Sequence, residues 1–547
     1  MGFRTFVEVK AHFYCQQRHF LPSNQFAAFM KSDILYPVGV QSFENLRNSG
    51  MIYVDKTAIM HELVRTTPFA FLSRPRRFGK SLLVSTMQAY FEGKRELFKG
   101  LAIEQLEQEW TPRPVLHLDL SGMAYTQPEA LDSLLDMYLT EWEKPFGEPQ
   151  HDMPAELRLA HVIRRAHEAS GQGVAVLVDE YDKPLVENFG RTDLQETFRR
   201  RLRALFGVLK SEGAHVQFAF LTGVSRFSKV SVFSDLNNLM DISLLPKYAT
   251  LCGLTRSEIA TYLQQGVEAL AEENGISPEA CMEKLREYYD GYHFGIPTPG
   301  IYNPFSVLST ISSRRFGSYW FETGTPTLLV DALQHRDYNL CELEGAHLDS
   351  SALACMDNED HNPLPLLYHT GYLTIKAYDN EYDEYTLGFP NKEVEQGFYK
   401  FIRPRFWKEE DSTFRLSHFV NDLRDGHPEA FMTRLQAMMC DSNFRIIGRQ
   451  ERYFHNTFFI FFRLLGFHVE VERHTSNGII DLVLKTKNYL YIMEFKMDRS
   501  AQAALHQIRE RGYALPFAAD GRRVFLIGVN FSSAKRRIDD WRIEPAS

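Results

Sequence analysis

The fold is decided by residues 69–83, Phe69-Ala-Phe-Leu-Ser-Arg-Pro-Arg-Arg-Phe-Gly-Lys-Ser-Leu-Leu83. The apolar run Phe69–Leu72 predicts a buried strand, and an arginine-rich loop separates it from Gly79-Lys80-Ser81 at the start of an apolar helix. This order is typical of a nucleotide phosphate-binding loop, because backbone N–H groups and the positive end of the helix face the anion. We therefore expect Lys80 to bind the outer phosphates of ATP and the Ser81 hydroxyl to ligate Mg2+.

One position departs from the general phosphate-loop pattern, which places a glycine five residues before Gly79. Arg74 stands there instead. The motif alone therefore leaves a surface Gly-Lys-Ser turn as an open alternative. If the loop binds a nucleotide, we expect the contacts to come from one contiguous set: Arg76, Arg77, Phe78, Gly79, Lys80, Ser81 and Leu82.

A second strand places acidic residues where ligands bind in open α/β sheets. Val174–Val178 are five apolar residues in a row, as in a strand buried on both faces of a parallel sheet, and Asp179 and Glu180 follow at its carboxyl edge. We expect Asp179 to hold Mg2+ through water or the Ser81 hydroxyl, and Glu180 to orient or deprotonate an attacking water. An acidic turn with no catalytic role is the simpler alternative.

The following strand, over 215–223, ends close to a further set of polar residues. Thr222 is a candidate γ-phosphate sensor, and Arg226 or Lys229 is a candidate for neutralising that phosphate. A polar loop with an exposed arginine is the alternative. Strands that alternate with helical segments, including a long helical stretch over about 128–170, predict an α/β fold with a parallel sheet.

Composition limits the classes of protein that fit. The length of 547 residues predicts about three domains, and the net charge of −9 argues against a chain that coats nucleic acid over its whole surface. The six cysteines have no close pairs, which excludes a zinc ribbon or a disulfide framework. No apolar run approaches the ~20 residues that span a bilayer. We therefore expect a cytoplasmic protein with no membrane partner.

Changes of pattern divide the chain into five segments. We expect an N-terminal extension over 1–29, a nucleotide-binding core over 30–250, a helical lid over 251–345, a winged-helix-like linker region over 346–435 and a final domain over 436–547.

Two local patterns support the middle segments. Thr255 and Glu258 have the spacing of a capping box at the start of a lid helix. A helix over 365–370 followed by a hairpin over 372–390 is the pattern of a winged helix. We expect His293, between these elements, to be a packed residue rather than a metal ligand.

The final segment contains a second candidate site. Asp481 lies in a predicted hairpin with Glu494 and Lys496, which the period of two places on the same face of their strand. The two carboxylates and the Phe495 carbonyl make an oxygen site suited to Mg2+, and Lys496 can position or activate a water. An ordinary hairpin with one charged face is the alternative, since Glu-x-Lys is widespread. The helix before the hairpin and the helix after it favour the functional interpretation.

Taken together, these motifs resemble a bacterial family of AAA-ATPase-like proteins with a C-terminal PD-(D/E)XK nuclease domain. The resemblance covers nearly all of residues 33–530 and implies a P-loop ATPase core of the ASCE type and an α/β restriction-endonuclease-like domain. The arginine-rich loop looks like this family's own form of the phosphate loop. The matching segments are Tyr53-Val-Asp-Lys-Thr57, Arg74-Pro-Arg-Arg-Phe-Gly-Lys-Ser81, Val178-Asp-Glu-Tyr-Asp182, Thr222-Gly-Val-Ser-Arg-Phe-Ser228, Tyr289-Asp-Gly-Tyr-His-Phe-Gly295, Phe321-Glu-Thr-Gly-Thr-Pro326 and Gly371-Tyr-Leu-Thr374.

The resemblance also assigns roles in the second site. It implies that Asp481, Glu494 and Lys496 carry the nuclease reaction, with Glu451 and Gln507 as supporting site residues. Ile479 stands where many relatives have arginine, a departure that concerns phosphate binding there and not the metal ligands.

We therefore expect an enzyme that binds and hydrolyses ATP and is coupled to a Mg2+-dependent nuclease acting on DNA. By analogy alone, its setting would be defence or mobile-element biology. Two other interpretations stay open: a nucleotide-dependent binding or signalling module with an inactive nuclease fold, and an ATPase that acts on protein partners. The sequence leaves the oligomeric state open, a homo-oligomer included.

Overall fold

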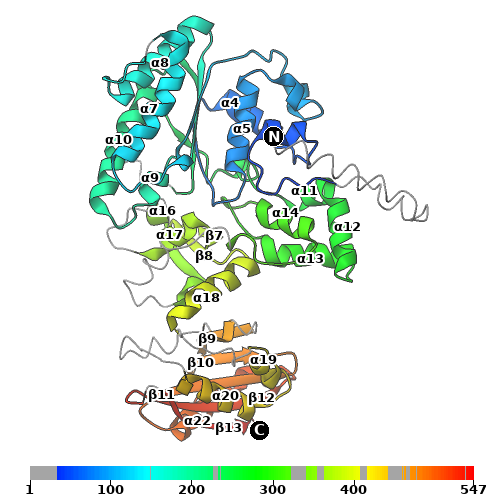
Figure 1. Ribbon diagram of the computed structural model, residues 1–547. Helices are drawn as coiled ribbons and strands as arrows, with labels where there is room; N and C mark the ends of the chain where they lie inside the picture. The colour runs from blue at the N-terminus through cyan, green and yellow to red at the C-terminus, as the bar shows by residue number, and fades with distance from the viewer. Residues whose placement is uncertain are drawn as a thin grey trace, which may run out of the picture.

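The structure, a computed structural model, describes most of the chain (Figure 1). The predicted N-terminal extension, residues 1–29, lies outside the described part. The described residues are 34–147, 149–225, 232–233, 236–321, 340–353, 362–406, 416–441, 459, 461–463, 468–475, 477–535 and 537–546.

A five-stranded sheet forms the centre of the N-terminal half. Its strand order is β2-β3-β4-β1-β5, and every neighbouring pair is parallel. The predicted α/β fold with a parallel sheet is therefore confirmed, and the carboxyl ends of its strands meet at one edge. The strands are β1 (Phe69–Ser73), β2 (Val115–Asp119), β3 (Val174–Asp179), β4 (Val216–Gly223) and β5 (Met240–Asp241).

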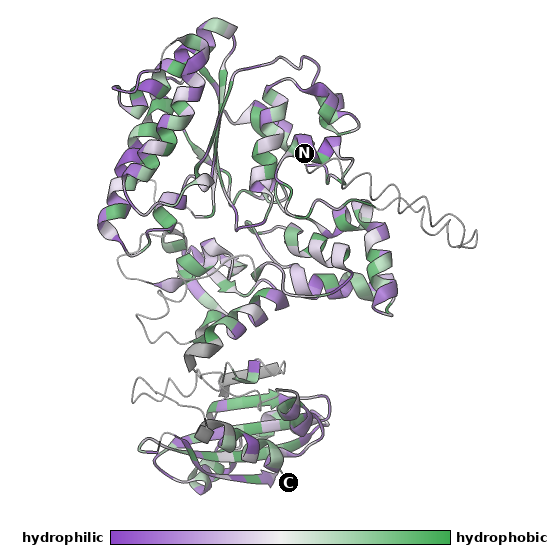
Figure 2. Ribbon diagram, in the orientation of Figure 1, coloured by the Kyte–Doolittle hydropathy of each residue, from purple (hydrophilic) through white to green (hydrophobic). Residues whose placement is uncertain are grey.

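Helices cover both faces of this sheet, as the fully apolar central strand requires. All six residues of β3 are buried. Ala175 and Leu177 belong to one core, while Val174, Val176 and Val178 belong to the core on the opposite face, because successive side chains of a strand point to opposite sides. Figure 2 shows the hydrophobic colouring of these strands between the two helical layers. The helices of the two layers are α3 (Phe43–Asn48), α4 (Thr57–Thr66) and α5 (Lys80–Phe91) on one face, and α7 (Glu129–Glu143), α8 (Ala155–Ser170) and α10 (Thr192–Ser211) on the other.

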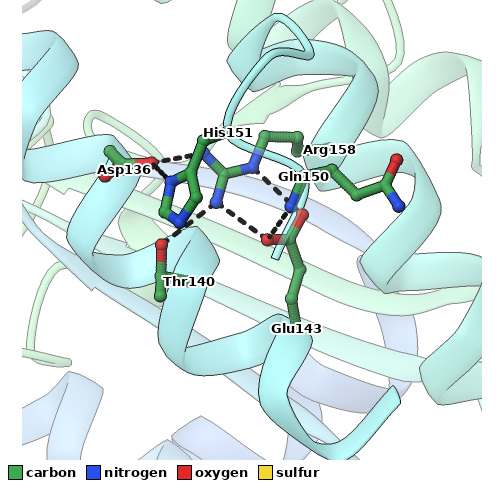
Figure 3. Close-up of polar contacts among 6 residues, drawn as sticks. All are labelled: Asp136, Thr140, Glu143, Gln150, His151 and Arg158. Carbon is green, nitrogen blue, oxygen red and sulfur yellow. Dashed lines mark hydrogen bonds and ion pairs between the residues drawn. The ribbon is translucent and has the colours of Figure 1, made fainter. Parts of the chain in front are cut away.

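The predicted helical stretch over about 128–170 contains two helices. The chain forms α7 and α8 with a connection between them, because Pro145, Pro149 and Pro154 lack the N–H groups that a continuous helix needs. A buried ion pair closes the connection, with Arg158 of α8 donating to both carboxylate oxygens of Glu143 at 3.0 and 2.8 Å (Figure 3).

The lid segment is helical, as predicted. The capping box at Thr255 and Glu258 is present at the start of its first helix. His293 is half-buried, and its ring nitrogen Nδ1 lies 3.1 Å from the Thr298 carbonyl, which agrees with a packed residue. The lid helices are α11 (Arg256–Tyr262), α12 (Gln264–Glu273), α13 (Pro278–Tyr289) and α14 (Pro304–Ser313).

The linker region contains the predicted helix and hairpin, and a further strand. The helix α17 (Pro363–Thr370) begins two residues before the predicted start, because the Asn362 side chain caps it. The hairpin is formed by β7 (Thr374–Asp379) and β8 (Glu384–Gly388), and β6 (Ala346–Asp349) pairs with β8. The long helix α18 (Lys392–Phe406) then leads toward the C-terminal domain (Figure 1).

The C-terminal domain is a five-stranded sheet with helices on both faces. The strand order is β13-β12-β11-β10-β9, with β11 and β12 parallel and the other pairs antiparallel. One face packs against α19 (Leu416–Arg424) and α20 (Pro428–Asp441), and the other against α22 (Ala501–Glu510). The strands are β9 (His468–Thr475), β10 (Gly478–Lys485), β11 (Tyr489–Met497), β12 (Arg523–Ser532) and β13 (Arg537–Pro545).

Short helices complete the described elements. They are α6 (Ile103–Leu106), α9 (Lys183–Val186), α16 (Ser350–Leu353) and the 3-10 turns Arg95–Phe98, Leu120–Gly122, Lys144–Phe146, Pro246–Tyr248, Leu340–Leu343 and Leu515–Phe517.

Candidate functional sites

The Gly-Lys-Ser tripeptide lies where β1 passes into α5, at the carboxyl edge of the parallel sheet. Gly79 caps the helix with φ +90°, a conformation that side chains rarely adopt. Lys80 is buried in the loop, and its Nζ donates to the carbonyls of Arg74 at 3.0 Å and Pro75 at 3.2 Å. The ammonium group is therefore held at the mouth of the helix by acceptors that a phosphate oxygen could replace.

The acidic end of β3 lies against this tripeptide. The Ser81 hydroxyl donates a hydrogen bond to the Asp179 carboxylate, and the charge of Lys80 acts on both Asp179 and Glu180. Burial raises the pKa of Asp179, and the Ser81 hydrogen bond and Lys80 oppose that rise. Burial likewise raises the pKa of Glu180, which has φ +50°. The structure thus brings four predicted residues together at one sheet edge.

A cavity of about 500 Å3 opens over this edge. Its wall combines the phosphate-loop residues with an apolar side formed by an N-terminal segment and the start of α14. The guanidinium of Arg77 lies over the Phe305 ring at 4.9 Å, which joins the two sides. The lining residues of the loop and acidic edge are Arg76, Arg77, Gly79, Lys80, Ser81, Leu82 and Glu180, and those of the apolar side include Pro37, Val40, Phe305 and Leu308.

Arg74, at the position where the general pattern has glycine, is a buried structural residue. Its guanidinium donates to the carbonyls of Ser73 and Ser243 at 2.8 Å and Tyr248 at 3.1 Å, and it lies 3.9 Å from the centre of the Phe294 ring. The side chain thus fixes the base of the loop and is not available to a phosphate. This contact set explains physically why the chain departs from the general pattern.

Two predicted nucleotide contacts, Phe78 and Thr222, have other surroundings. Phe78 is buried, with its ring centre 4.8 Å from that of Tyr292, so its side chain packs the loop against the core and does not face the cavity. The Thr222 hydroxyl donates to the Leu72 carbonyl at 2.9 Å and is fully buried between β4 and β1. Arg226 and Lys229 lie outside the described residues.

Three polar residues that the sequence analysis did not select lie at the same edge. Asp119 is paired in register with Asp179, and its carboxylate accepts from the Ser121 N–H at 2.8 Å and hydroxyl at 3.0 Å. Lys183 donates to the Ser121 carbonyl, and both residues line the cavity. Asp119 could have been selected, because it ends an alternating strand in the same way as Asp179. The contact with Lys183 has no sequence signal, since 62 positions separate it from Ser121.

The second site forms where β10, β11 and α22 meet. The Asp481 carboxylate accepts from the Phe495 N–H at 2.7 Å, and one oxygen of Glu494 accepts from Lys496 Nζ at 2.8 Å and from the Gln507 amide. The Tyr513 hydroxyl donates to the Ile479 carbonyl at 2.8 Å and lies 3.5 Å from the Gln507 amide nitrogen. The predicted side chains therefore lie together, while Glu451 lies outside the described residues.

The other oxygen of Glu494 is buried and has no hydrogen-bond partner. Burial, and then the charge of Asp481, raise the pKa of Glu494 to about 7, against the opposing effect of Lys496. A buried acceptor with no donor beside a second carboxylate fits a divalent cation. Among the described residues no group of three or more His, Cys, Asp or Glu side chains is placed to hold a metal ion.

The close approach of α22 to the sheet sets the position of Gln507. A Cβ at Gly528 of β12 would lie 2.3 Å from the Ala501 carbonyl, so the helix start and the strand are in contact at that glycine. This contact holds α22 over β11 and brings Gln507 to Glu494.

The fold and these sites define two classes of domain: a P-loop α/β nucleotide-binding domain and a nuclease-like α/β domain. Residues 37–233 match the model of a family described as predicted AAA-ATPase, and residues 449–541 match that of the PD-(D/E)XK nuclease superfamily. An uncharacterized protein in the vnfD 5′ region of Azotobacter chroococcum mcd 1 is 35% identical over 520 residues, which cover 93% of this chain and 98% of the relative. The chain belongs to this family, in which a predicted AAA-ATPase domain is joined to a PD-(D/E)XK nuclease superfamily domain.

No helix in the described part of the chain has the length and apolar character needed to cross a membrane.

Proposed function

We propose that the chain is an ATPase coupled to a Mg2+-dependent nuclease that acts on DNA. The observation that carries the proposal is the buried, unpartnered oxygen of Glu494, because it lies in a cluster that also contains Asp481, Lys496 and Gln507. An acceptor of this kind costs stability unless a cation or a proton satisfies it.

At the first site, the buried ammonium of Lys80 would exchange the Arg74 and Pro75 carbonyls for phosphate oxygens of ATP. Ser81 and Asp179, which already share a hydrogen bond, would hold Mg2+. Glu180 lines the cavity, and its raised pKa suits a group that accepts a proton from water. The apolar side of the cavity, at Val40 and Phe305, would receive the base.

At the second site, Asp481, Glu494 and the Phe495 carbonyl would hold Mg2+, and Lys496 and Gln507 would keep the Glu494 carboxylate oriented. Mg2+, when bound, supplies positive charge that stabilises the charge developing on the phosphate, at either site. Lys496 is placed to position a water beside the phosphate.

The test is to measure ATP hydrolysis and the cleavage of plasmid DNA by the full chain with Mg2+ or Mn2+. We expect Lys80→Ala to abolish hydrolysis, and Asp481→Ala and Lys496→Ala to abolish cleavage without abolishing hydrolysis. Asp539→Ala and Lys487→Ala remove exposed side chains of the same types from the same domain and serve as matched controls. RNA of equal length in a parallel assay tests the choice of DNA.

A binding module with an inactive nuclease fold is the second candidate. This candidate predicts that DNA binds and that neither the wild type nor any variant cleaves it, with ATP or without.

A further inference from the structure

The lid and the linker region hold the phosphate loop through a tryptophan. Trp320 Nε1 donates to the Arg76 carbonyl at 3.1 Å. Gly371 packs beside the same loop, and a Cβ there would lie 2.7 Å from Pro75 Cβ and 3.4 Å from the Trp320 ring. Lys80 donates to the carbonyl of Pro75, the residue before Arg76. If Lys80 exchanges this carbonyl for another acceptor, the change therefore occurs beside the contacts of Trp320 and Gly371 with the loop.

The same tryptophan is fixed to the start of α18 by a buried glutamate. The Trp320 N–H donates to Glu393 Oε1 at 2.8 Å, and the Ser306 hydroxyl donates to Glu393 Oε2 at 2.7 Å. Glu393 is 1% exposed. Ser306 follows Phe305, which lines the nucleotide cavity. Two sides of the cavity, the loop and the start of α14, are therefore tied to one carboxylate.

The opposite end of this chain of contacts reaches the nuclease domain. Glu395, two residues after Glu393, forms an ion pair with Arg463 at 2.9 Å. The Tyr399 ring, one turn further along α18, lies 5.6 Å from that of Phe459. Helix α18 thus contacts Arg463 through this ion pair and Phe459 through this ring contact.

This segment belongs to two hydrophobic cores. Phe459 is part of the core that contains the ATPase sheet and the linker region, whereas Phe461 and Phe462 are part of the nuclease core. That second core includes Leu482 and Phe495, the sequence neighbours of Asp481 and Glu494. Densely packed cores transmit displacement, because their side chains cannot move independently.

We propose that α18 couples the two sites, so that occupation of the nucleotide site changes the nuclease site through Trp320, Glu393 and the Glu395–Arg463 pair. The element that differs between the two states is the loop: Lys80 donates to loop carbonyls without nucleotide and to phosphate oxygens with it. A ligand changes a remote site only if it binds two conformations of the protein with different affinities. Here the two conformations differ in the acceptors of Lys80, which are loop carbonyls in one and phosphate oxygens in the other. The inference rests on the proposed function at both sites.

The experiment compares the full chain with Glu395→Gln, Arg463→Gln and the double variant, because the amides keep the side-chain size and remove the charge pair. Lys392→Gln is the matched control, since it removes an ion pair with Glu287 from the same helix start. Amide hydrogen exchange at 459–463 and 481–496 is measured with and without a non-hydrolysable ATP analogue, beside binding of the analogue and the rate of DNA cleavage.

We expect the analogue to change exchange in both segments of the wild type, and to change the cleavage rate on the order of 5-fold or more, the lower end of measured allosteric couplings. In the Glu395 and Arg463 variants the analogue still binds with the same affinity. The exchange rates and the cleavage rate measured with the analogue, divided by those measured without it, should fall to a ratio of about 1. The double variant is no worse than either single variant, because both remove one interaction. Lys392→Gln keeps the wild-type response.

The outcomes separate the coupling from the proposed function. An analogue that binds to the wild type and leaves both C-terminal segments unchanged overturns the coupling, while ATP binding stands. Variants that respond like the wild type overturn the route through Glu395 and Arg463. If no analogue binds at all, the nucleotide site itself is refuted and the coupling falls with it.

Discussion

Lys496 Nζ lies 2.8 Å from one carboxylate oxygen of Glu494, whose other oxygen is buried without a partner. Gln507 donates to the oxygen that Lys496 already holds. Among the described residues, the side chains of Lys496 and Gln507 thus donate to the same oxygen of Glu494, and the charge of Asp481 acts on this carboxylate. The negative charge of Asp481 makes an anion there unfavourable and a cation favourable.

This arrangement predicts that the metal-free chain loses stability as the pH rises through about 7, the raised pKa of Glu494. The folded chain holds the Glu494 proton above the ordinary pKa of 4.5. The bound proton therefore contributes fully to the free energy of unfolding below pH 4.5, and this contribution is lost as the pH rises through about 7, the pKa in the folded chain. We expect the free energy of unfolding of Glu494→Gln to be higher than that of the wild type by on the order of 1–3 kcal/mol at pH 8, and similar to it at pH 4.5. Urea unfolding in EDTA measures this, and parallel pH profiles for the two proteins would contradict it.

Restoring the general phosphate-loop pattern should damage the protein. Arg74→Gly removes a buried guanidinium and leaves the carbonyls of Ser243 and Tyr248 without their donor. We expect a loss on the order of 3 kcal/mol in the free energy of unfolding. Arg76→Gly, on the same loop, has no such buried contacts on its side chain and serves as the control. Equal unfolding midpoints for the two variants would show that Arg74 is not a structural anchor.

The part of the site that the sequence predicted follows from local rules. Five apolar residues before Asp179 predict a strand buried on both faces, and parallel strands bring Asp179 and Ser81 to one edge. The role of Arg74 could not be predicted, because its partners are 169 and 174 positions away and bind it through backbone carbonyls. The break between α7 and α8 coincides with Pro145, Pro149 and Pro154, which mark it in the sequence.

The second site shows the same division. Period two predicted that Glu494 and Lys496 share a face, and they form an ion pair. The contact with Gln507 depends on how α22 packs on β11 and β12, and only the family resemblance suggested it. Strand β6 was not predicted, since its partners in β8 lie 35 (Asp349↔Glu384) to 41 (Ala346↔Leu387) residues later, and only this tertiary pairing makes it a strand.

Asp119 should contribute to ATP hydrolysis, although the sequence analysis did not select it. Its carboxylate orients Ser121, which lines the cavity with Lys183. We expect Asp119→Asn to lower kcat for ATP by roughly 10-fold, the usual effect of removing a group that orients a site residue. Glu129→Gln, an exposed acid at the start of α7, is the control. A steady-state assay with wild-type kcat for Asp119→Asn would exclude this role.

The ion pair between Arg158 and Glu143 should be essential for the stability of the α7–α8 layer and unnecessary for nucleotide binding. Both side chains are buried, and Glu143→Ala removes two hydrogen bonds of the Arg158 guanidinium, which keeps Asp136 and Thr140 as partners (Figure 3). We expect a cost of about 2–3 kcal/mol. Glu141→Ala, two residues before Glu143, breaks an exposed ion pair with Lys144 and should change the free energy of unfolding by less than about 1 kcal/mol. The helices α7 and α8 pack on the face of the sheet opposite α5, so the folded fraction of Glu143→Ala should bind an ATP analogue with wild-type affinity. Thermal unfolding measures the first two effects and calorimetric titration below the unfolding midpoint the third. Equal midpoints for the two variants would show that the buried pair adds nothing that an exposed pair does not.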